Sequence, residues 1–239
     1  MILKHFYLAL DSDDFTDTKI VSDFNFQTDY LTHFVEKRLV KERFEVNGFN
    51  MLMIRARKKP KDDFLLEEHY KCLTIEVPFN ESEYQKLYPF ENKYPLAGLL
   101  QPVENEKEFC DFLIDMTIQG IEKGRKLKAP IPCDFLINTV LDFKNGGCKN
   151  EWVHKTKTFK EHGIKATLLC RLTVNYFALE LIIEKNKQEL FKKEILKTKP
   201  HSIQYKQEFK DIVIKDGKLV ITKDMYQNPS LFELPLSAI

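Results

Sequence analysis

The chain has 239 residues, so it can form one large domain or two small ones, and either can bury a hydrophobic core. Hydrophobic residues make up 43% and charged residues 31% of the chain, a balance that argues against wholesale disorder. The 37 lysine and arginine residues against 36 aspartate and glutamate residues give a net charge of +1, which excludes the overall basic excess of most nucleic-acid-binding proteins.

The five cysteines are an odd number without close pairs, which argues for reduced thiols and against a disulfide framework. Cys110 and Cys170 fall at apolar positions of periodic segments, where cysteine packs as a small hydrophobic residue. Residues 1–11 are too short and too often charged to form a signal peptide, and no apolar run approaches the roughly 18 residues that cross a membrane. The sequence therefore predicts a cytoplasmic protein without membrane contact.

The first part of the chain predicts strands and one helix around charged loops. In chain order, the pattern predicts a strand at residues 2–10, a helix at 29–41 capped by Asp29, and strands at 49–57 and 72–79. An acidic loop, DSDDFTDT, follows the first of these strands, and a basic loop follows the second.

The middle of the chain predicts three helices. Asn80 and Glu83 form a capping box at the start of a short helix. The same pattern at residues 105–108 precedes a long helix, which Gly124 is expected to stop. Pro132 lies in the first turn of the next helix, where its missing N–H costs nothing. The two longer helices predict a helical hairpin against the sheet.

The last third of the chain predicts antiparallel strands. Residues 164–174 alternate between apolar and polar side chains, which is the period of a half-buried strand. Asp216 and Gly217 lie between two apolar runs and suit a two-residue type I′ turn, so residues 211–222 predict a hairpin. Further strands are expected at residues 152–159, 176–184, 190–197 and 231–234.

Together these elements predict an α+β fold with a mixed β-rich N-terminal part, a central helical hairpin and a C-terminal antiparallel β-meander packed on helices. The change from helix to sheet at residues 144–150 suggests two domains. The first, residues 1–147, is the mixed α/β part that ends in the hairpin, and the second, residues 148–239, is the meander. The alternative is one continuous domain over residues 1–239.

Asp11 and Asp13 form the clearest catalytic motif, a D-x-D directly after an apolar strand. This resembles the first motif of haloacid-dehalogenase-type phosphatases. The resemblance implies that Asp11 is the nucleophile, that Asp13 is the acid/base and that both hold Mg²⁺. Asp14 and Phe15 stand where that family has glycine and a small hydroxyl residue. The alternative, which we favour, is a solvated acidic turn.

Other chemistry finds less support in the sequence. His69 and Cys72 form one loose pair, whereas a structural zinc site normally has two tight pairs. None of the eight glycines belongs to a phosphate-binding loop. The sequence therefore predicts neither a metal nor a cofactor, and it favours a protein that is not an enzyme.

Two surface features point to partners. The basic cluster at residues 55–61 suits a nucleic-acid-binding adaptor, although solvated charge in a loop is the simpler interpretation. Tyr84, Tyr88 and Tyr94 lie in a segment with proline and glutamate, which is typical of a protein-binding surface. The alternative for these tyrosines is a loop folded onto the domain by its aromatic rings.

We interpret the chain as a non-enzymatic protein-binding module. A specific form of this hypothesis is a bacterial immunity protein that neutralises a toxin by covering its active site, since the composition suits an AT-rich bacterial genome. Asp11, Asp13, Asp14 and Asp17 would then attract a basic toxin. The alternatives are a Mg²⁺-dependent phosphoryl hydrolase using Asp11 and Asp13, and the nucleic-acid-binding adaptor. The sequence predicts no oligomeric state.

Overall fold

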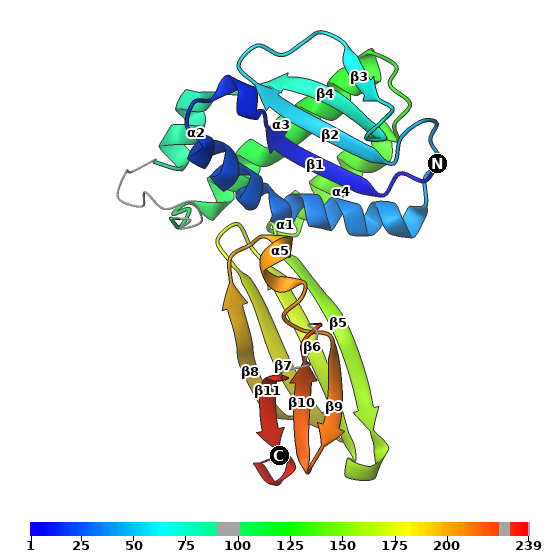
Figure 1. Ribbon diagram of the computed structural model, residues 1–239, viewed down its shortest axis with the longest axis vertical. Helices are drawn as coiled ribbons and strands as arrows, with labels where there is room; N and C mark the ends of the chain where they lie inside the picture. The colour runs from blue at the N-terminus through cyan, green and yellow to red at the C-terminus, as the bar shows by residue number, and fades with distance from the viewer. Residues whose placement is uncertain (90–100, 225–229, 239) are drawn as a thin grey trace. The chain divides into compact units, whose positions relative to one another are not determined.

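The computed structural model describes residues 1–89, 101–224 and 230–238. Within these residues the chain forms five α-helices and three β-sheets, one mixed and two antiparallel, which confirms the predicted α+β fold. The chain divides into two compact units, Met1–Asn150 and Glu151–Ile239 (Figure 1). No helix in the described part of the chain is long and apolar enough to cross a membrane.

The first unit is built on a four-stranded mixed sheet. Its strands are β1 (His5–Leu10), β2 (Met51–Arg57), β3 (Phe64–Glu67) and β4 (Cys72–Pro78). They lie in the order β1-β2-β4-β3, in which β1, β2 and β4 run parallel and β3 runs antiparallel to β4. The sequence predicted three of these strands. It missed β3, whose four residues show no alternation and follow directly on the charged loop.

Four helices belong to this unit. They are α1 (Thr18–Glu42), α2 (Glu81–Leu87), α3 (Glu106–Lys126) and α4 (Cys133–Asn145). Both predicted capping boxes are confirmed at their N-caps. The side chain of Asn80 accepts the N–H of Glu83 at 3.2 Å, and that of Asn105 accepts the N–H of Glu108 at 3.3 Å. The predicted hairpin is also present, since α3 packs against α4.

Two predicted helix ends are wrong. The start of α1 lies well before Asp29, because Asp17 accepts the N–H of Lys19 at 2.8 Å and caps the helix there. The end of α3 lies beyond Gly124, which the sequence suggested as a stop. A Cβ on Gly124 would lie 2.7 Å from Cδ1 of Ile75, so this glycine lets the helix approach the sheet closely.

The helices cover one face of the mixed sheet. Alternate residues of β1 and β2 point toward them and are buried, namely Phe6, Leu8, Leu10, Leu52, Ile54 and Ala56. Helix α3 crosses β2 at Gly120, where an added Cβ would lie 2.6 Å from Cγ2 of Ile54. Figure 1 shows α3 and α4 behind the sheet and α1 along β1. Among the described residues, no helix packs on the opposite face.

Cys110 of α3 and Cys148, which follows α4, form a disulfide with 6.5 Å between their Cα atoms. The expectation that Cys110 packs as a free thiol is therefore wrong. Gly147 and Cys148 both have positive φ angles, so the chain turns back toward α3 after α4 ends. The two cysteines are 38 positions apart, and this spacing gave no sign of the bond.

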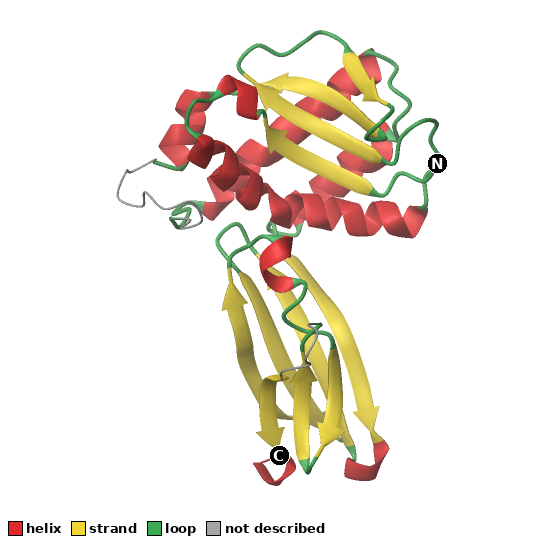
Figure 2. Cartoon of the chain, viewed as in Figure 1, coloured by secondary structure: helices red, strands yellow, loops and turns green. Residues whose placement is uncertain are grey.

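The second unit contains two antiparallel sheets rather than one meander (Figure 2). The first sheet has the order β5-β6-β7-β8, and the second has the order β11-β10-β9. Their bounds are β5 (Asn150–Phe159), β6 (Ile164–Leu172), β7 (Phe177–Lys185), β8 (Gln188–Thr198), β9 (Asp211–Lys215), β10 (Lys218–Thr222) and β11 (Ser230–Pro235), with the short helix α5 (Ser202–Tyr205) between β8 and β9.

Aromatic rings join these two sheets, as between Phe191 of β8 and Phe232 of β11, whose centroids are 6.3 Å apart. Asp216 and Gly217 have φ angles of 51° and 71°. Both positive angles are those of a type I′ turn, which confirms the predicted hairpin.

Candidate functional site

The side of the mixed sheet that faces away from the helices is the candidate functional site, and we call it the open face. Strand alternation and register place twelve side chains on it: His5, Tyr7, Ala9, Met51, Met53, Arg55, Arg57, Leu65, Glu67, Cys72, Thr74 and Glu76. Parallel strands are normally covered on both faces, because their crossover helices pack there. A mainly parallel sheet that has no helix on one face, among the residues that the structure describes, is therefore unusual, and this singles out the open face.

A row of four side chains, three of them apolar, crosses the open face. The register pairs Tyr7 with Met53, Met53 with Thr74, and Thr74 with Leu65, so each strand contributes one side chain to the row. Tyr7 is 38% exposed and Leu65 is 44% exposed. Directly opposite side chains on neighbouring strands lie about 5 Å apart. Thr74 is only 1% exposed, so the exposed apolar area of the row lies on the two sides of β4, at Tyr7 and the half-buried Met53 and at Leu65.

The carboxyl ends of the parallel strands carry a charged cluster beside this row. Arg57 at its centre donates from Nε and Nη2 to the Asp14 carboxylate, at 3.1 and 3.0 Å. Its Nη1 lies 3.3 Å from Asp11 and 3.5 Å from Glu76. These bonds, first of all those to Asp14, raise the pKa of the Arg57 guanidinium above its ordinary value. The same bonds hold the pKa of Asp14 below its ordinary value.

Arg55 belongs to the same cluster, because its guanidinium lies 3.7 Å from Asp11 and 3.8 Å from Glu67. The cluster therefore sets four carboxylates against two guanidinium groups, a balance of −2, from Asp11, Asp14, Glu67, Glu76, Arg55 and Arg57. Several charges in one partly buried network stabilise a fold more than isolated surface pairs do. The cluster thus stiffens the carboxyl end of the sheet, and the nearby ammonium group of Lys58 offsets part of its negative charge.

The acidic loop and the basic loop of the sequence meet here and pair with each other. Besides the contacts of Arg57, the ammonium group of Lys58 lies 2.8 Å from Glu81 and 4.4 Å from the centre of the Phe15 ring. The two loops are far apart in the sequence, and each suggested a separate partner: a basic toxin for the first and nucleic acid for the second. The structure shows that much of their charge is satisfied internally.

The four predicted acidic site residues have different environments. Asp11 is 8% exposed, and its Oδ1 accepts the N–H of Asp13 at 2.9 Å. Asp14 is bound to Arg57, and Asp17 caps α1. Asp13 is exposed, and no side-chain bond of its own is found among the described residues. Of the four, Asp13 is therefore the carboxylate most open to a partner.

The tyrosines predicted to meet a partner are placed differently. Tyr84 and Tyr88 are 0% and 1% exposed, and Tyr94 lies outside the described residues. The Tyr84 hydroxyl donates to Gln27 of α1 at 2.9 Å, and the Tyr88 hydroxyl donates to Asp23 at 3.0 Å. Tyr84 and Tyr88 therefore hold α2 and its following turn against α1, and neither ring is accessible to another protein.

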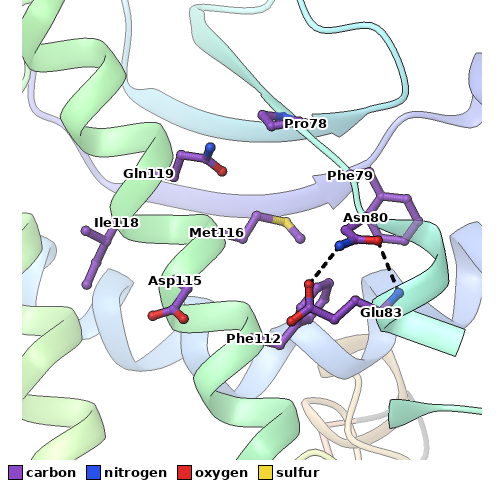
Figure 3. A pocket seen from close by; sticks show the side chains of 9 residues that line it. All are labelled: Pro78, Phe79, Asn80, Glu83, Phe112, Asp115, Met116, Ile118 and Gln119. Carbon is purple, nitrogen blue, oxygen red and sulfur yellow. Dashed lines mark hydrogen bonds between the residues drawn. The ribbon is translucent and has the colours of Figure 1, made fainter. Parts of the chain in front are cut away.

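A groove of about 840 Å³ lies between α2 and α3, beyond the end of β4 (Figure 3). Figure 3 shows Asn80 and Glu83 of the capping box on the α2 side of the groove and Phe112 and Met116 on its α3 side. Phe112 is 8% exposed and Met116 is 5% exposed. Both of these side chains are therefore largely buried in the packing of the first unit.

No group of three or more histidine, cysteine, aspartate or glutamate side chains that could hold a metal ion is present among the described residues. The chain matches no family model, no curated protein and no solved structure.

Sequence reasoning missed the open face, although one signal was present. In MLMIRAR, the polar residues Arg55 and Arg57 alternate with apolar residues at the end of the strand. A parallel strand covered on both sides normally shows a continuous apolar run. The alternation at β2 therefore indicated a half-exposed strand, but only the pairing of β1 with β2 and β4 shows that the exposed halves form one surface.

Proposed function

We propose that this protein is a non-enzymatic protein-binding module that docks its partner on the open face. The observation that carries the proposal is the exposed apolar row of Tyr7, Met53 and Leu65 on the uncovered side of a mainly parallel sheet. Such sheets are stable when both faces are covered, so a partner that covers this one supplies the missing layer. Burial of the row removes apolar area from water, which favours association.

The charge of the site suggests what the partner carries next to its apolar surface. The balance of −2 in the cluster, together with the exposed carboxylate of Asp13, favours a partner with basic residues at that end of the sheet. A toxin neutralised by an immunity protein is one partner of this kind, and that role stays part of the proposal. The predicted cytoplasmic location also stays a prediction, and the Cys110–Cys148 disulfide argues against it, because disulfides persist mainly in oxidising compartments.

The test is capture of a stoichiometric partner by the wild-type protein and by two variants. Tyr7→Ser with Met53→Ser removes the two apolar side chains that β1 and β2 contribute to the row, without touching the helix-covered face. Val40→Ser is the matched control, because Val40 is 54% exposed on α1 and lies off the open face. We expect the partner to be retained by Val40→Ser and lost, by roughly tenfold or more in affinity, by the double variant.

Equal retention by all three proteins would place the interface elsewhere and would contradict the proposal. Circular dichroism of the double variant checks that its fold is intact. The same proteins, once a partner is identified, are compared by calorimetry, where loss of affinity with an unchanged heat capacity would also count against burial of the apolar row.

No observation favours the phosphoryl hydrolase as a second candidate. A nucleophilic carboxylate has to reach its substrate, whereas Asp11 is 8% exposed and has both oxygens occupied. One oxygen accepts the N–H of Asp13, and the other lies 3.3 Å from Arg57. These bonds explain the D-x-D pattern as a structural turn at the end of β1.

A further inference from the structure

The two edge strands of the mixed sheet, β1 and β3, differ in how their outer edges are covered. At one edge, α1 runs along β1, and two of its side chains accept N–H groups of the strand. The Phe6 N–H donates to Glu36 at 3.2 Å, and the Leu10 N–H donates to Asn25 at 3.1 Å. This is a common way to protect an edge strand from pairing with other chains. The α1 side of the sheet is therefore closed.

The other edge is β3, and it is bare. In the part of the chain that the structure describes, neither a strand nor a helix nor a side chain makes a hydrogen bond to its outer edge. Leu65 and Leu66 are 44% and 38% exposed there, on opposite faces of the strand. The strand is protected only by its short length of four residues and contains none of three other usual devices against edge pairing, a lysine, a proline or a bulge.

The edge strand β8 of the second unit shows those devices by contrast. It carries Lys192, Lys193 and Lys197, and its pairing with β7 has two register shifts. Lysines and irregular pairing both discourage an additional strand. The bare edge of β3 is therefore not a general property of this chain.

The charges around β3 indicate which kind of strand fits. Asp62 and Asp63 precede it, and Glu67 and Glu68 lie at its end. With Lys61 and Lys71 included, residues 61–71 hold four carboxylates and two ammonium groups, a balance of −2. A strand laid beside β3 brings its own flanking residues close to these carboxylates, so basic flanks are favoured and acidic flanks are opposed.

We propose that β3 receives an extended segment of the partner protein, which adds a fifth strand to the mixed sheet and carries lysine or arginine on both sides of a short apolar stretch. This rests on the proposed function in that the partner is a protein. The main-chain hydrogen bonds of the added strand satisfy the free N–H and C=O groups of β3, and its apolar side chains cover Leu65 and Leu66. The same partner can then extend over the open face.

A second copy of this chain fits the edge less well. Pairing of β3 with β3 of another copy would bring two sets of these four carboxylates together, and like charges in opposed positions destabilise a pair of strands. The charge around β3 therefore favours a different, basic protein over self-association.

The test uses the full chain and a synthetic peptide of alternating valine and threonine residues with lysines at both ends. Hydrogen exchange read by mass spectrometry follows the amides of Phe64–Glu67 with and without the peptide. We expect slower exchange in β3 and no change in β1, whose edge α1 covers. A peptide with glutamates in place of the lysines is expected to bind roughly tenfold more weakly.

Reversing the charge of residues beside β3 tests whether these carboxylates set the peptide preference. Asp63→Lys with Glu68→Lys changes two exposed side chains whose carboxylates have no ion pair in the described residues, and we expect it to reverse the preference in favour of the glutamate peptide. Glu104→Lys with Glu161→Lys alters the net charge equally, at exposed sites outside β3, and is expected to keep the wild-type preference.

Unchanged exchange in β3 at saturating peptide, or equal binding of both peptides, would overturn the proposal. Protection of β3 that depends on protein concentration without peptide would also overturn it, because a second copy would then occupy the edge. This experiment can fail independently of the proposed function. The variant Tyr7→Ser with Met53→Ser alters the open face but leaves the edge of β3 intact, so it should still bind the peptide.

Discussion

Single residues in the charged cluster divide into those that hold the fold and those that are free to meet a partner. Asp14 receives two hydrogen bonds from Arg57 and a third from the N–H of Lys58 at 2.8 Å. Asp13, one position earlier, is exposed and receives no comparable bonds. Replacing all the acidic residues of this loop together would therefore mix a loss of stability with any loss of binding.

Asp14→Asn is expected to lower the free energy of unfolding by about 1–2 kcal/mol at neutral pH, because it replaces a charge-assisted acceptor opposite Arg57. The pKa of Asp14 is lowered from 3.8, first by its hydrogen bond to Arg57, so the carboxylate stabilises the fold above that pH and loses this effect as pH falls. Urea denaturation should show the gap between wild type and variant closing below about pH 4.

Asp13→Asn is the matched control for that experiment. We expect its unfolding midpoint to stay near that of the wild type both at neutral pH and below about pH 4. If the difference in free energy of unfolding between wild type and Asp14→Asn persists unchanged at acid pH, the destabilisation does not come from loss of the Asp14 carboxylate charge.

The buried tyrosines at α2 lead to a prediction at alkaline pH. Burial, with smaller effects from Asp23, raises the pKa of both Tyr84 and Tyr88 above 10.0. Above pH 10 the unfolded chain releases these protons and the folded chain keeps them, so the unfolded state binds fewer protons and stability falls as pH rises. Each tyrosine should contribute about 1.4 kcal/mol per pH unit to this fall.

The double variant Tyr84→Phe with Tyr88→Phe is expected to lose about 1–3 kcal/mol at neutral pH for each hydroxyl removed, since Gln27 and Asp23 lose a buried partner. Its stability should then decline less steeply than that of the wild type above pH 10. Thermal denaturation across this range measures both effects, and parallel pH profiles would contradict the assignment of the alkaline loss to these two residues.

At the scale of elements, the sequence predicted the features that depend on neighbouring residues and missed those that depend on contacts with distant ones. Asn80 and Asn105 cap their helices as expected, because a cap needs only the next three residues. The start of α1 was missed because it depends on polar residues such as Asp23 and Gln27, which are buried by contact with α2. Strand β3 was missed because its pairing with β4, rather than its four residues, makes it a strand.

The approach of α3 to the sheet gives a prediction at this scale. An alanine in a helix is normally about 1 kcal/mol more favourable than a glycine. At Gly120, however, the new Cβ would lie 2.6 Å from Cγ2 and 2.8 Å from Cδ1 of Ile54. Gly120→Ala is therefore expected to destabilise the protein by about 1–3 kcal/mol, since the helix and sheet have to separate or Ile54 has to leave its rotamer.

Ile54→Ala supplies the control, because it removes both of the crowded carbon atoms. In a double-mutant cycle, the combined variant should be less destabilised than the sum of its two single changes. Strict additivity in urea denaturation would show that the packing of α3 on β2 is not what requires glycine.

At the scale of the whole molecule, contacts between distant parts of the chain decide what the sequence could not show. The open face exists because α1 returns the chain so that β2 lies parallel to β1 and the helices gather on one side. The charged cluster joins loops that the sequence presents as separate acidic and basic features. The Cys110–Cys148 bond joins residues 38 positions apart. Composition and periodicity do not show which distant segments meet in any of these three.

The disulfide gives the last prediction, because it lies wholly within the first unit. Closing a loop of 38 residues restricts the unfolded chain, which corresponds to about 4 kcal/mol as an upper value. Cys110→Ala with Cys148→Ala is therefore expected to cost about 2–4 kcal/mol. Cys133→Ala, which removes a free cysteine, controls for the loss of a cysteine side chain. It is expected to lower the free energy of unfolding by less than the double variant does.

The part of the chain in which the disulfide variant loses stability is as informative as the size of the loss. If the two units unfold separately, hydrogen exchange should become faster in α3 and α4 of the disulfide variant and stay unchanged in β6 and β7. Faster exchange throughout the chain would instead show that one cooperative transition links both units, and the predicted division into two domains would then fail in energetic terms. The same measurement thus tests the stabilising bond and the independence of the unit that carries the open face.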